Sequence, residues 1–133
     1  MTDAALSSMH ARSTFAKLLD VWNGGSIEGM TRLLAPGYRG HMLHMVGGER
    51  DASAYPGWIL RYREANPGAT FVIVEQFVAD DRLVSRLTAT RADPVSRRPL
   101  VANGLNLSRY ESNGRLAEEW AIWSPWLDVA GDS

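Results

Sequence analysis

Several polar residues lie within segments that are otherwise apolar and have the pattern of β-strands. They are His41, Arg86, Asn103, Asn106, Glu118 and Glu119. The last two are adjacent in the segment "LAEEWAIW". Successive side chains of a strand point to opposite faces, so Glu119 shares a face with Ala121 and Glu118 shares one with Trp120. One of the two glutamates is therefore expected to face the interior.

An arginine beside a carboxylate in a water-poor cavity is the most informative combination these residues offer. Each group offsets the desolvation of the other, and one of them is left able to handle a proton. Such pairs occur at active sites and also as structural ion pairs. Arg86 could equally lie on the solvated outer face or in an oligomer interface, and His41 could close the end of a strand. The sequence leaves these alternatives open.

Other kinds of chemistry are excluded by composition and by motif. The chain has no cysteine, which removes disulfides, thiolate nucleophiles and cysteine-based metal sites. It has no phosphate loop, dinucleotide fingerprint or nucleophile elbow. His41 and His44 are three residues apart on a predicted strand and so on opposite faces, and no metal site is expected. A formal net charge of -1 with scattered arginines gives no basic surface for nucleic acid.

Aromatic residues are numerous and could form the wall of a pocket for a flat, polycyclic ligand. The set is Trp22, Tyr55, Trp58, Tyr62, Trp120, Trp123 and Trp126. Most members of such a set belong to the core or to a dimer interface. The expected substrate-binding residues are Tyr55, Trp58, Asn103, Trp120 and Trp123.

The first half of the chain predicts helices. Apolar residues recur at helical spacing over residues 3–22, and "NGG" ends that helix. Ser26 is placed to cap a short second helix that "APG" stops, and residues 38–44 have the pattern of a short strand. After the loop "VGGERD", Asp51 could cap a third helix, which ends at "NPG".

The second half predicts strands, because from Thr70 onward the period falls to two and β-branched residues dominate. The segments "TFVIVEQFVA", "RLVSRLTATRA", "LVANGLNLSRYE" and "RLAEEWAIW" follow one another with short turns, which predicts an antiparallel meander. Helices followed by strands indicate an α+β fold in which a curved antiparallel sheet wraps around the N-terminal helices as a cone. The concave face of a cone is a natural pocket for a small apolar ligand.

Length and hydropathy bear on organisation and location. With 133 residues, positions 1–133 are expected to form a single domain. No apolar run approaches the ~20 residues that span a bilayer, and the N-terminus lacks the apolar region of a secretory signal. We expect a cytoplasmic protein that does not associate with membranes.

Two segments resemble a known family. "VWNGGSIEGMTRLLAPGYRGHM" and "LNLSRYESNGRLAEEW", with the order of elements, are similar to the SnoaL-like polyketide cyclases of the nuclear transport factor 2-like superfamily. The resemblance covers residues 15–123. It implies a small, cofactor-free, oligomeric enzyme that closes rings of aromatic polyketides by intramolecular aldol chemistry. Relatives on this fold open epoxides, isomerise ketosteroids, hydroxylate or dehydrate polyketides, or only bind ligands.

The resemblance also assigns roles to residues. His41 matches the family histidine at the end of the first strand, and Arg86 matches an inward arginine of the epoxide-opening relatives. The family's acid/base aspartate corresponds to Ala121, which cannot move a proton. Glu119 lies two residues earlier on the same face and is the expected substitute. Alternatively, a bulge turns Glu118 inward, or the acid/base function is lost.

These observations lead to one expectation with two alternatives. We expect a cofactor-independent cyclase for a hydrophobic, polyketide-type small molecule, with Glu119, His41 and Arg86 as catalytic residues and with Asn103 or Asn106 beside a developing oxyanion. A homodimer is expected, since the convex sheet face is left uncovered. The alternatives are an epoxide hydrolase, hydroxylase or dehydratase-like isomerase on the same fold, and a non-catalytic binding or dimerisation module.

Overall fold

The structure is a computed structural model that describes residues 3–129. Its elements are α1 (Asp3–Trp22), the 3-10 helix η1 (Met30–Leu33), β1 (Leu34–Met42), β2 (Glu49–Asp51), α2 (Tyr55–Ala65), β3 (Thr70–Ala79), β4 (Arg82–Ala92), β5 (Pro99–Tyr110), β6 (Leu116–Trp123) and β7 (Leu127–Asp128). The bounds of α1, β3 and β4 coincide with the segments predicted from the sequence. In the part of the chain that the structure describes, no helix is long and apolar enough to cross a bilayer.

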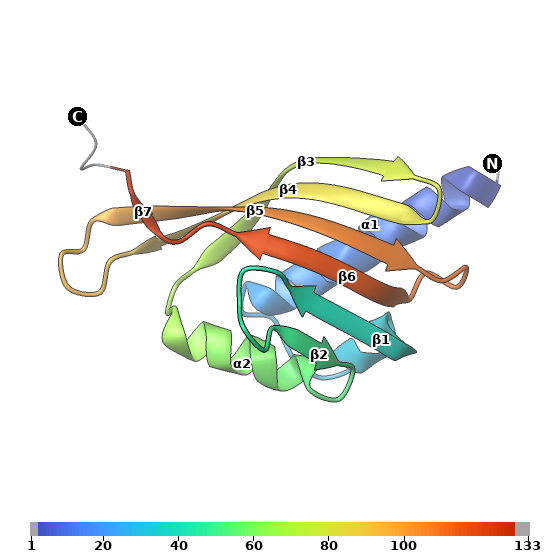
Figure 1. Ribbon diagram of the computed structural model, residues 1–133, viewed down its shortest axis with the longest axis horizontal. Coiled ribbons are helices and arrows are strands. Elements are labelled where there is room, and N and C mark those ends of the chain that lie inside the picture. Colours follow the sequence, from blue (N-terminus) through green and yellow to red (C-terminus); the bar gives the residue numbers. More distant parts are fainter. Residues whose placement is uncertain (1–2, 130–133) are drawn as a thin grey trace.

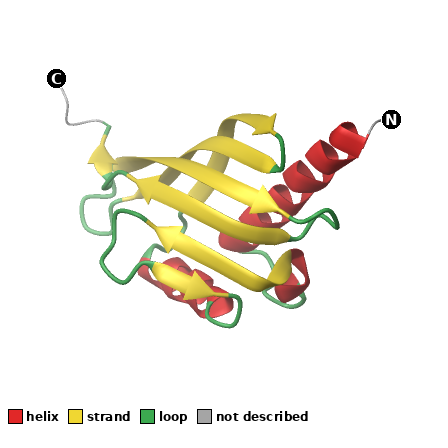
Figure 2. Ribbon diagram, turned by 45° about the vertical axis from the view of Figure 1, so that its right-hand side comes forward, coloured by secondary structure: helices red, strands yellow, loops and turns green. Residues whose placement is uncertain are grey.

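One large curved sheet holds all the strands (Figures 1 and 2). Its order is β2-β1-β6-β5-β4-β3, and β7 pairs with β5. The predicted meander from β3 to β6 is present, and each of its pairs is antiparallel. The sheet as a whole is mixed rather than antiparallel, because β1 runs parallel to β6. This pairing brings the N-terminal strand beside the last long strand, so residues far apart in the sequence share one region of the sheet.

Both helices lie against the concave side of the sheet (Figure 2). The inner face of α1 buries Phe15, Leu18 and Val21 in a core that also holds Leu83 and Leu116. In Figure 1, α1 runs behind the long strands and α2 lies below β1 and β2. The sheet therefore curves around the helices, as an α+β cone does, and its concave face is only partly filled by them.

The prediction that Asp51 caps the third helix is wrong, because Asp51 ends β2 and the N-cap of α2 is Ala54, without a side-chain cap hydrogen bond. The Asp51 carboxylate accepts hydrogen bonds from the Ala54 amide at 2.9 Å and from the Ser53 hydroxyl at 2.7 Å. These bonds hold the pKa of Asp51 below its usual range. Asn66 follows the helix, and its amide bonds the Tyr62 carbonyl at 2.9 Å.

Three short elements differ from expectation. The second helix is only the single 3-10 turn η1, because β1 already begins at Leu34, before the "APG" that was expected to stop a helix. The expected loop "VGGERD" contains β2, whose three residues pair with β1. The two-residue strand β7 was also not expected. Both strands are too short to produce a readable alternation of apolar and polar residues.

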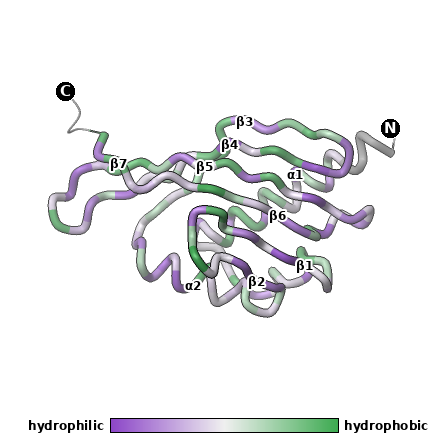
Figure 3. Tube along the Cα trace, in the orientation of Figure 1, coloured by the Kyte–Doolittle hydropathy of each residue, from purple (hydrophilic) through white to green (hydrophobic). Residues whose placement is uncertain are grey.

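Alternation along the long strands separates two faces of different chemistry, and Figure 3 shows apolar and polar residues following one another along them. On β6 the side chains of Glu119 and Ala121 are buried on the concave side, whereas Glu118 and Ile122 are more exposed. On β5 the buried positions include Asn106, and Asn103 is exposed. The position of each polar residue along its strand therefore decides which face it serves.

Candidate active site

A cavity of about 490 Å³ lies between the concave face of the sheet and the two helices. Residues that follow β1 and β6, among them Met45 and Trp126, also line it. Apolar and aromatic side chains form most of the wall, among them Phe15, Leu18, Leu19, Trp22, Tyr55, Trp58, Tyr62, Phe71, Leu87, Ala89, Ala102, Leu116, Ala121, Trp123 and Trp126. Such a wall suits a flat apolar molecule.

Glu119 is the only carboxylate among the described residues that line this cavity. It is 6% exposed. Its Oε2 accepts a hydrogen bond from the Tyr38 hydroxyl at 2.9 Å, and its Oε1 accepts one from Asn106 Nδ2 at 2.9 Å. Because an ionised carboxylate only accepts hydrogen bonds, two donors converging on it suit the anion.

Arg50 supplies the positive charge for this carboxylate. Its Nη2 lies 3.6 Å from Glu119 Oε1, and its Nε donates to the Tyr38 hydroxyl at 3.0 Å. The guanidinium is 4.3 Å from the centre of the Tyr55 ring and 5.4 Å from that of Trp58, so it also makes cation–π contacts. Arg50 itself is 4% exposed, which makes this a buried ion pair.

The local backbone explains how Arg50 reaches Glu119. In the pairing of β1 with β2, Arg50 lies opposite Gly40. A Cβ atom at position 40 would collide with the Tyr38 hydroxyl and come within 3.0 Å of Arg50 Nε. Glycine at this position therefore leaves the space in which Arg50 and Tyr38 form their hydrogen bond.

Burial and charge fix the protonation of the two partners of Glu119. Burial raises the pKa of Tyr38 far above its usual value and the nearby Glu119 raises it further, so the hydroxyl stays neutral and can donate. Burial alone would lower the pKa of Arg50, but Tyr55, Glu119 and Tyr38 together raise it. Arg50 is thus a permanent cation beside the carboxylate.

Two buried polar atoms at this site have no hydrogen-bond partner among the described residues. They are Nη1 of Arg50 and Oδ1 of Asn106. One is a donor and the other an acceptor, and each belongs to a residue that contacts Glu119. Native proteins rarely leave buried polar atoms unpaired, so these two mark unused hydrogen-bonding capacity next to the carboxylate.

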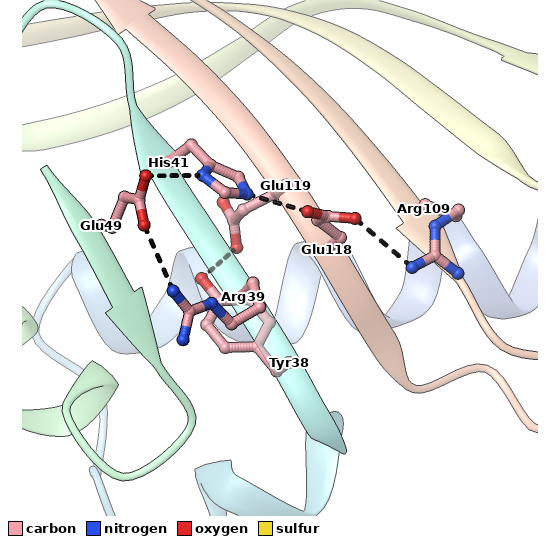
Figure 4. Close-up of polar contacts among 7 residues, drawn as sticks. All are labelled: Tyr38, Arg39, His41, Glu49, Arg109, Glu118 and Glu119. Atoms are coloured by element: carbon pink, nitrogen blue, oxygen red, sulfur yellow. Dashed lines mark hydrogen bonds and ion pairs between the residues drawn. The ribbon is translucent and has the colours of Figure 1, made fainter.

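Glu118 and His41 form a separate cluster on the convex face (Figure 4). His41 Nε2 is 2.8 Å from Glu118 Oε2, and the imidazole stacks on Trp120 at 5.5 Å. Arg109 Nη2 lies 3.5 Å from the other carboxylate oxygen. The hydrogen bond from His41, with help from Arg109, holds the pKa of Glu118 below its usual range. Figure 4 shows Glu119 turned instead toward Tyr38.

Comparison with known proteins places this architecture in a family. The model of the SnoaL-like domain matches residues 15–119. The chain belongs to the SnoaL-like family. Comparison with curated protein sequences gives no match.

Solved structures of SnoaL-like proteins share the fold of this one. IdmH from Streptomyces antibioticus, a candidate polyketide cyclase, is 24% identical over 86% of this chain and 91% of its own, with a TM-score of 0.75. A loop-truncation variant of IdmH is 26% identical over 86% and 92%, with a TM-score of 0.74. The epoxide hydrolase/cyclase-like enzyme SalBIII, which has a role in pyran ring formation in the polyether salinomycin, is 11% identical over 88% and 92%, with a TM-score of 0.70.

The residues expected at the site of this SnoaL-like chain divide between the two faces of the sheet. Glu119, Tyr55, Trp58 and Trp123 line the cavity. So does Asn106, which the sequence offered as an alternative to Asn103. The bulge in the pairing of β5 with β6 separates the pair Arg109–Glu118 from the pair Tyr110–Leu116, so on β6 it lies before Glu118. It does not turn Glu118 inward.

The structure does not bring the other expected residues to the cavity. Arg86 is exposed on the convex face, where its Nε lies 2.7 Å from Glu75 Oε1. His41 and Trp120 stack on each other on that face, and Asn103 is exposed. The strand period explains each case: Arg86 lies between the buried Ser85 and Leu87, and neighbours on a strand cannot share a face.

Sequence reasoning missed Arg50, which forms an ion pair with Glu119, and Tyr38, which donates a hydrogen bond to it. Arg50 lies in the three-residue β2, where no period is visible. Tyr38 was within the predicted first strand, three residues before His41 and therefore on the other face. That parity was a usable signal.

Within residues 3–129, no group of three or more histidine, aspartate and glutamate side chains is arranged to hold a metal ion. Among the polar residues that line the cavity, Glu119, Arg50 and Asn106 contact one another, and the Tyr38 hydroxyl donates to the same carboxylate.

Proposed function

We propose that this protein is a cofactor-independent acid/base enzyme that closes a ring in a hydrophobic, polyketide-type small molecule. The observation that carries the proposal is the Glu119 carboxylate, buried at the wall of an apolar cavity and held by Tyr38, Asn106 and Arg50. A general base needs a fixed position, access to the substrate and little competing water, and this setting supplies all three.

Glu119 acts as the base in the proposed reaction. Its carboxylate removes a proton from a carbon next to a substrate carbonyl, and the resulting enolate carbon attacks a second carbonyl of the same molecule. A carbon–carbon bond forms as the second C=O π bond breaks. The alkoxide then takes the proton back from Glu119, which returns to its starting state.

Arg50 stabilises the charge that moves during this reaction. While Glu119 is ionised, Arg50 is its counter-ion. Once Glu119 accepts the proton, the negative charge lies on the enolate oxygen, and the guanidinium beside it is already in place to balance that charge. Its Nη1, which has no hydrogen-bond partner among the described residues, is an available donor for the oxygen. In this role Arg50 replaces the expected Arg86.

Ring closure can be tested with ortho-acetonylbenzaldehyde. Intramolecular aldol addition of its methyl carbon to the aldehyde, followed by loss of water, gives fluorescent β-naphthol. We expect the protein to accelerate the appearance of β-naphthol and the Glu119→Gln variant to lose the acceleration. A wild-type protein that binds the compound but leaves its rate unchanged would contradict the proposal and favour a binding module.

We further propose that the protein is a homodimer joined through the convex face of the sheet. Cross-strand neighbours on this face form an apolar row of Phe77, Val84, Leu107 and Trp120. Phe77 is 58% exposed, and Leu105, in the adjacent row, is 54% exposed. A continuous apolar face of this kind commonly marks an interface.

The mass of the protein in solution tests the dimer. Sedimentation velocity is expected to give a dimer for the wild type and a monomer for Phe77→Glu. A monomeric wild type at micromolar concentration would overturn this proposal while leaving the cavity chemistry untouched.

A further inference from the structure

The cavity wall carries more guanidinium groups than carboxylates. Within the described part of the chain, the carboxylate and guanidinium groups on its wall are those of Glu119, Arg50 and Arg61. Glu119 and Arg50 compensate each other as a buried pair. Arg61 remains as an uncompensated cation, because no carboxylate among the described residues lies within ion-pair distance of it.

Arg61 lies at the opening of the cavity rather than at its base. It is an exposed residue of α2, yet it contributes to the lining. Its guanidinium is 5.9 Å from the centre of the Trp58 ring, which also lines the cavity. A cation at the end of an aromatic wall is therefore available to a ligand that enters along that wall.

The position of the Arg61 guanidinium is shaped by its own helix. Gly57 lies one turn earlier on α2, and a Cβ atom there would come within 3.2 Å of Arg61 Nη1. Because position 57 is glycine, the guanidinium can lie back over the helix and reach Trp58. The arrangement thus depends on two neighbours on the same helix, Gly57 and Trp58.

A second arginine adds positive charge at the same end. Arg91 Nη1 donates to Asn66 Oδ1 at 2.7 Å, and its guanidinium is 5.0 Å from the Trp126 ring. Asn66 and Trp126 both line the cavity. Arg91, like Arg61, has no carboxylate within ion-pair distance among the described residues. Two arginines without an ion-pair partner among the described residues therefore contact this part of the wall, whereas Arg50 and Glu119 form a pair with each other.

From this asymmetry we infer that the ligand of the cavity is an aromatic acid whose anionic group, a carboxylate or an acidic phenolate, binds to Arg61 at the opening. Its flat apolar body then lies along the aromatic wall, and the end remote from the anion points toward Glu119. The orientation follows from charge, because Glu119 already neutralises Arg50, whereas Arg61 has no carboxylate within ion-pair distance among the described residues and attracts the anion. The inference shares its cavity with the proposed function and adds the class and orientation of the substrate.

Binding of a matched pair of probes tests this inference. The probes are β-naphthoate and methyl β-naphthoate, which share the ring system and differ in charge. By isothermal titration calorimetry at low salt, the wild type is expected to bind the acid about two- to fivefold more tightly than the ester, the size expected for an ion pair with one exposed partner. Arg61→Gln is expected to remove this preference, and Arg61→Lys to retain most of it.

The control is Arg32→Gln, which removes an equal charge from an exposed residue of η1 outside the cavity lining. It should keep the preference of the wild type. An acid that binds the wild type no more tightly than the ester would overturn the inference, as would an Arg61→Gln variant that keeps the preference. Because the readout is binding, a protein that prefers the acid but closes no ring supports this inference and contradicts the proposed function.

Discussion

Glu118 and Glu119 are adjacent on β6 and serve opposite faces of the sheet. Glu119 is buried at the cavity, where Tyr38 and Asn106 donate to its carboxylate. Glu118 lies on the convex face, where it contacts His41 and Arg109. Two residues of identical chemistry thus have different environments because of the strand period alone. Each glutamate is the natural control for the other.

Loss of Arg50 is expected to destabilise the fold. An Arg50→Met variant leaves the Glu119 carboxylate buried without its counter-ion, and breaking a buried pair in this way costs about 3–5 kcal/mol. In the double variant Arg50→Met/Glu119→Leu no charge is left uncompensated, so its loss of stability should be smaller than the sum of the two single losses. Urea denaturation gives the free energy of unfolding of the wild type, of the two single variants Arg50→Met and Glu119→Leu, and of the double variant. Additive losses would show that the two residues do not interact.

The packing of Trp123 on Gly104 gives a second prediction. A Cβ atom at position 104 would collide with the indole of Trp123, which lines the cavity and packs edge-on against Phe71 at 5.3 Å. Gly104→Ala should lower the free energy of unfolding by about 1–3 kcal/mol, as overpacking of a core does. It should also change the near-ultraviolet circular dichroism of the tryptophans. Gly37→Ala is the control, because a Cβ atom there meets nothing within 4 Å. Equal effects of the two substitutions would refute the contact.

The convex cluster predicts a change in titration. The hydrogen bond from His41 is the main reason that the pKa of Glu118 is low, so His41→Ala should raise that pKa toward its ordinary value. A lowered pKa in the folded state stabilises the protein above the ordinary glutamate pKa, and this contribution is lost as pH falls through the lower value. In the variant, the contribution should be smaller and its loss should be complete at a higher pH.

Carbon NMR of the Glu118 carboxyl group measures this pKa directly. His44→Ala is the control, since the His44 ring contacts the Trp123 amide rather than Glu118. A Glu118 pKa that is the same in wild type and His41→Ala would show that the hydrogen bond has no influence on the carboxylate.

Most of the fold could be predicted from the sequence, because apolar residues recur at regular spacing along its long helices and strands. Helix α1 and strands β3 and β4 have the bounds that the apolar pattern predicted. The same period placed Glu119 with Ala121, and both line the cavity. Short elements could not be read in this way. Strand β2 has three residues and depends on pairing with β1, which is a tertiary interaction that leaves no local signal.

The site was less readable than the fold, and Arg86 shows why. Its neighbours Leu83, Leu87 and Ala89 are apolar at alternate positions, which indicates that the intervening Arg86 and Thr88 face outward. The family resemblance favoured an inward arginine and outweighed this pattern. The arginine beside the carboxylate comes instead from β2, and only the folded chain brings Arg50 and Glu119 together.

The most direct test of the account is proton abstraction by Glu119 compared with Glu118. The probe is β-tetralone, an aromatic ketone whose acidic carbon–hydrogen bonds exchange with D₂O when a base removes the proton. Wild type and Glu118→Gln are expected to accelerate deuterium incorporation equally, as followed by mass spectrometry. Glu119→Gln should lose about 10²–10⁴-fold of that acceleration, the usual contribution of a positioned general base. Because this variant leaves Arg50 without its counter-ion, circular dichroism under the assay conditions checks that it is folded. Undiminished exchange by Glu119→Gln, or an equal loss in Glu118→Gln, would contradict the account.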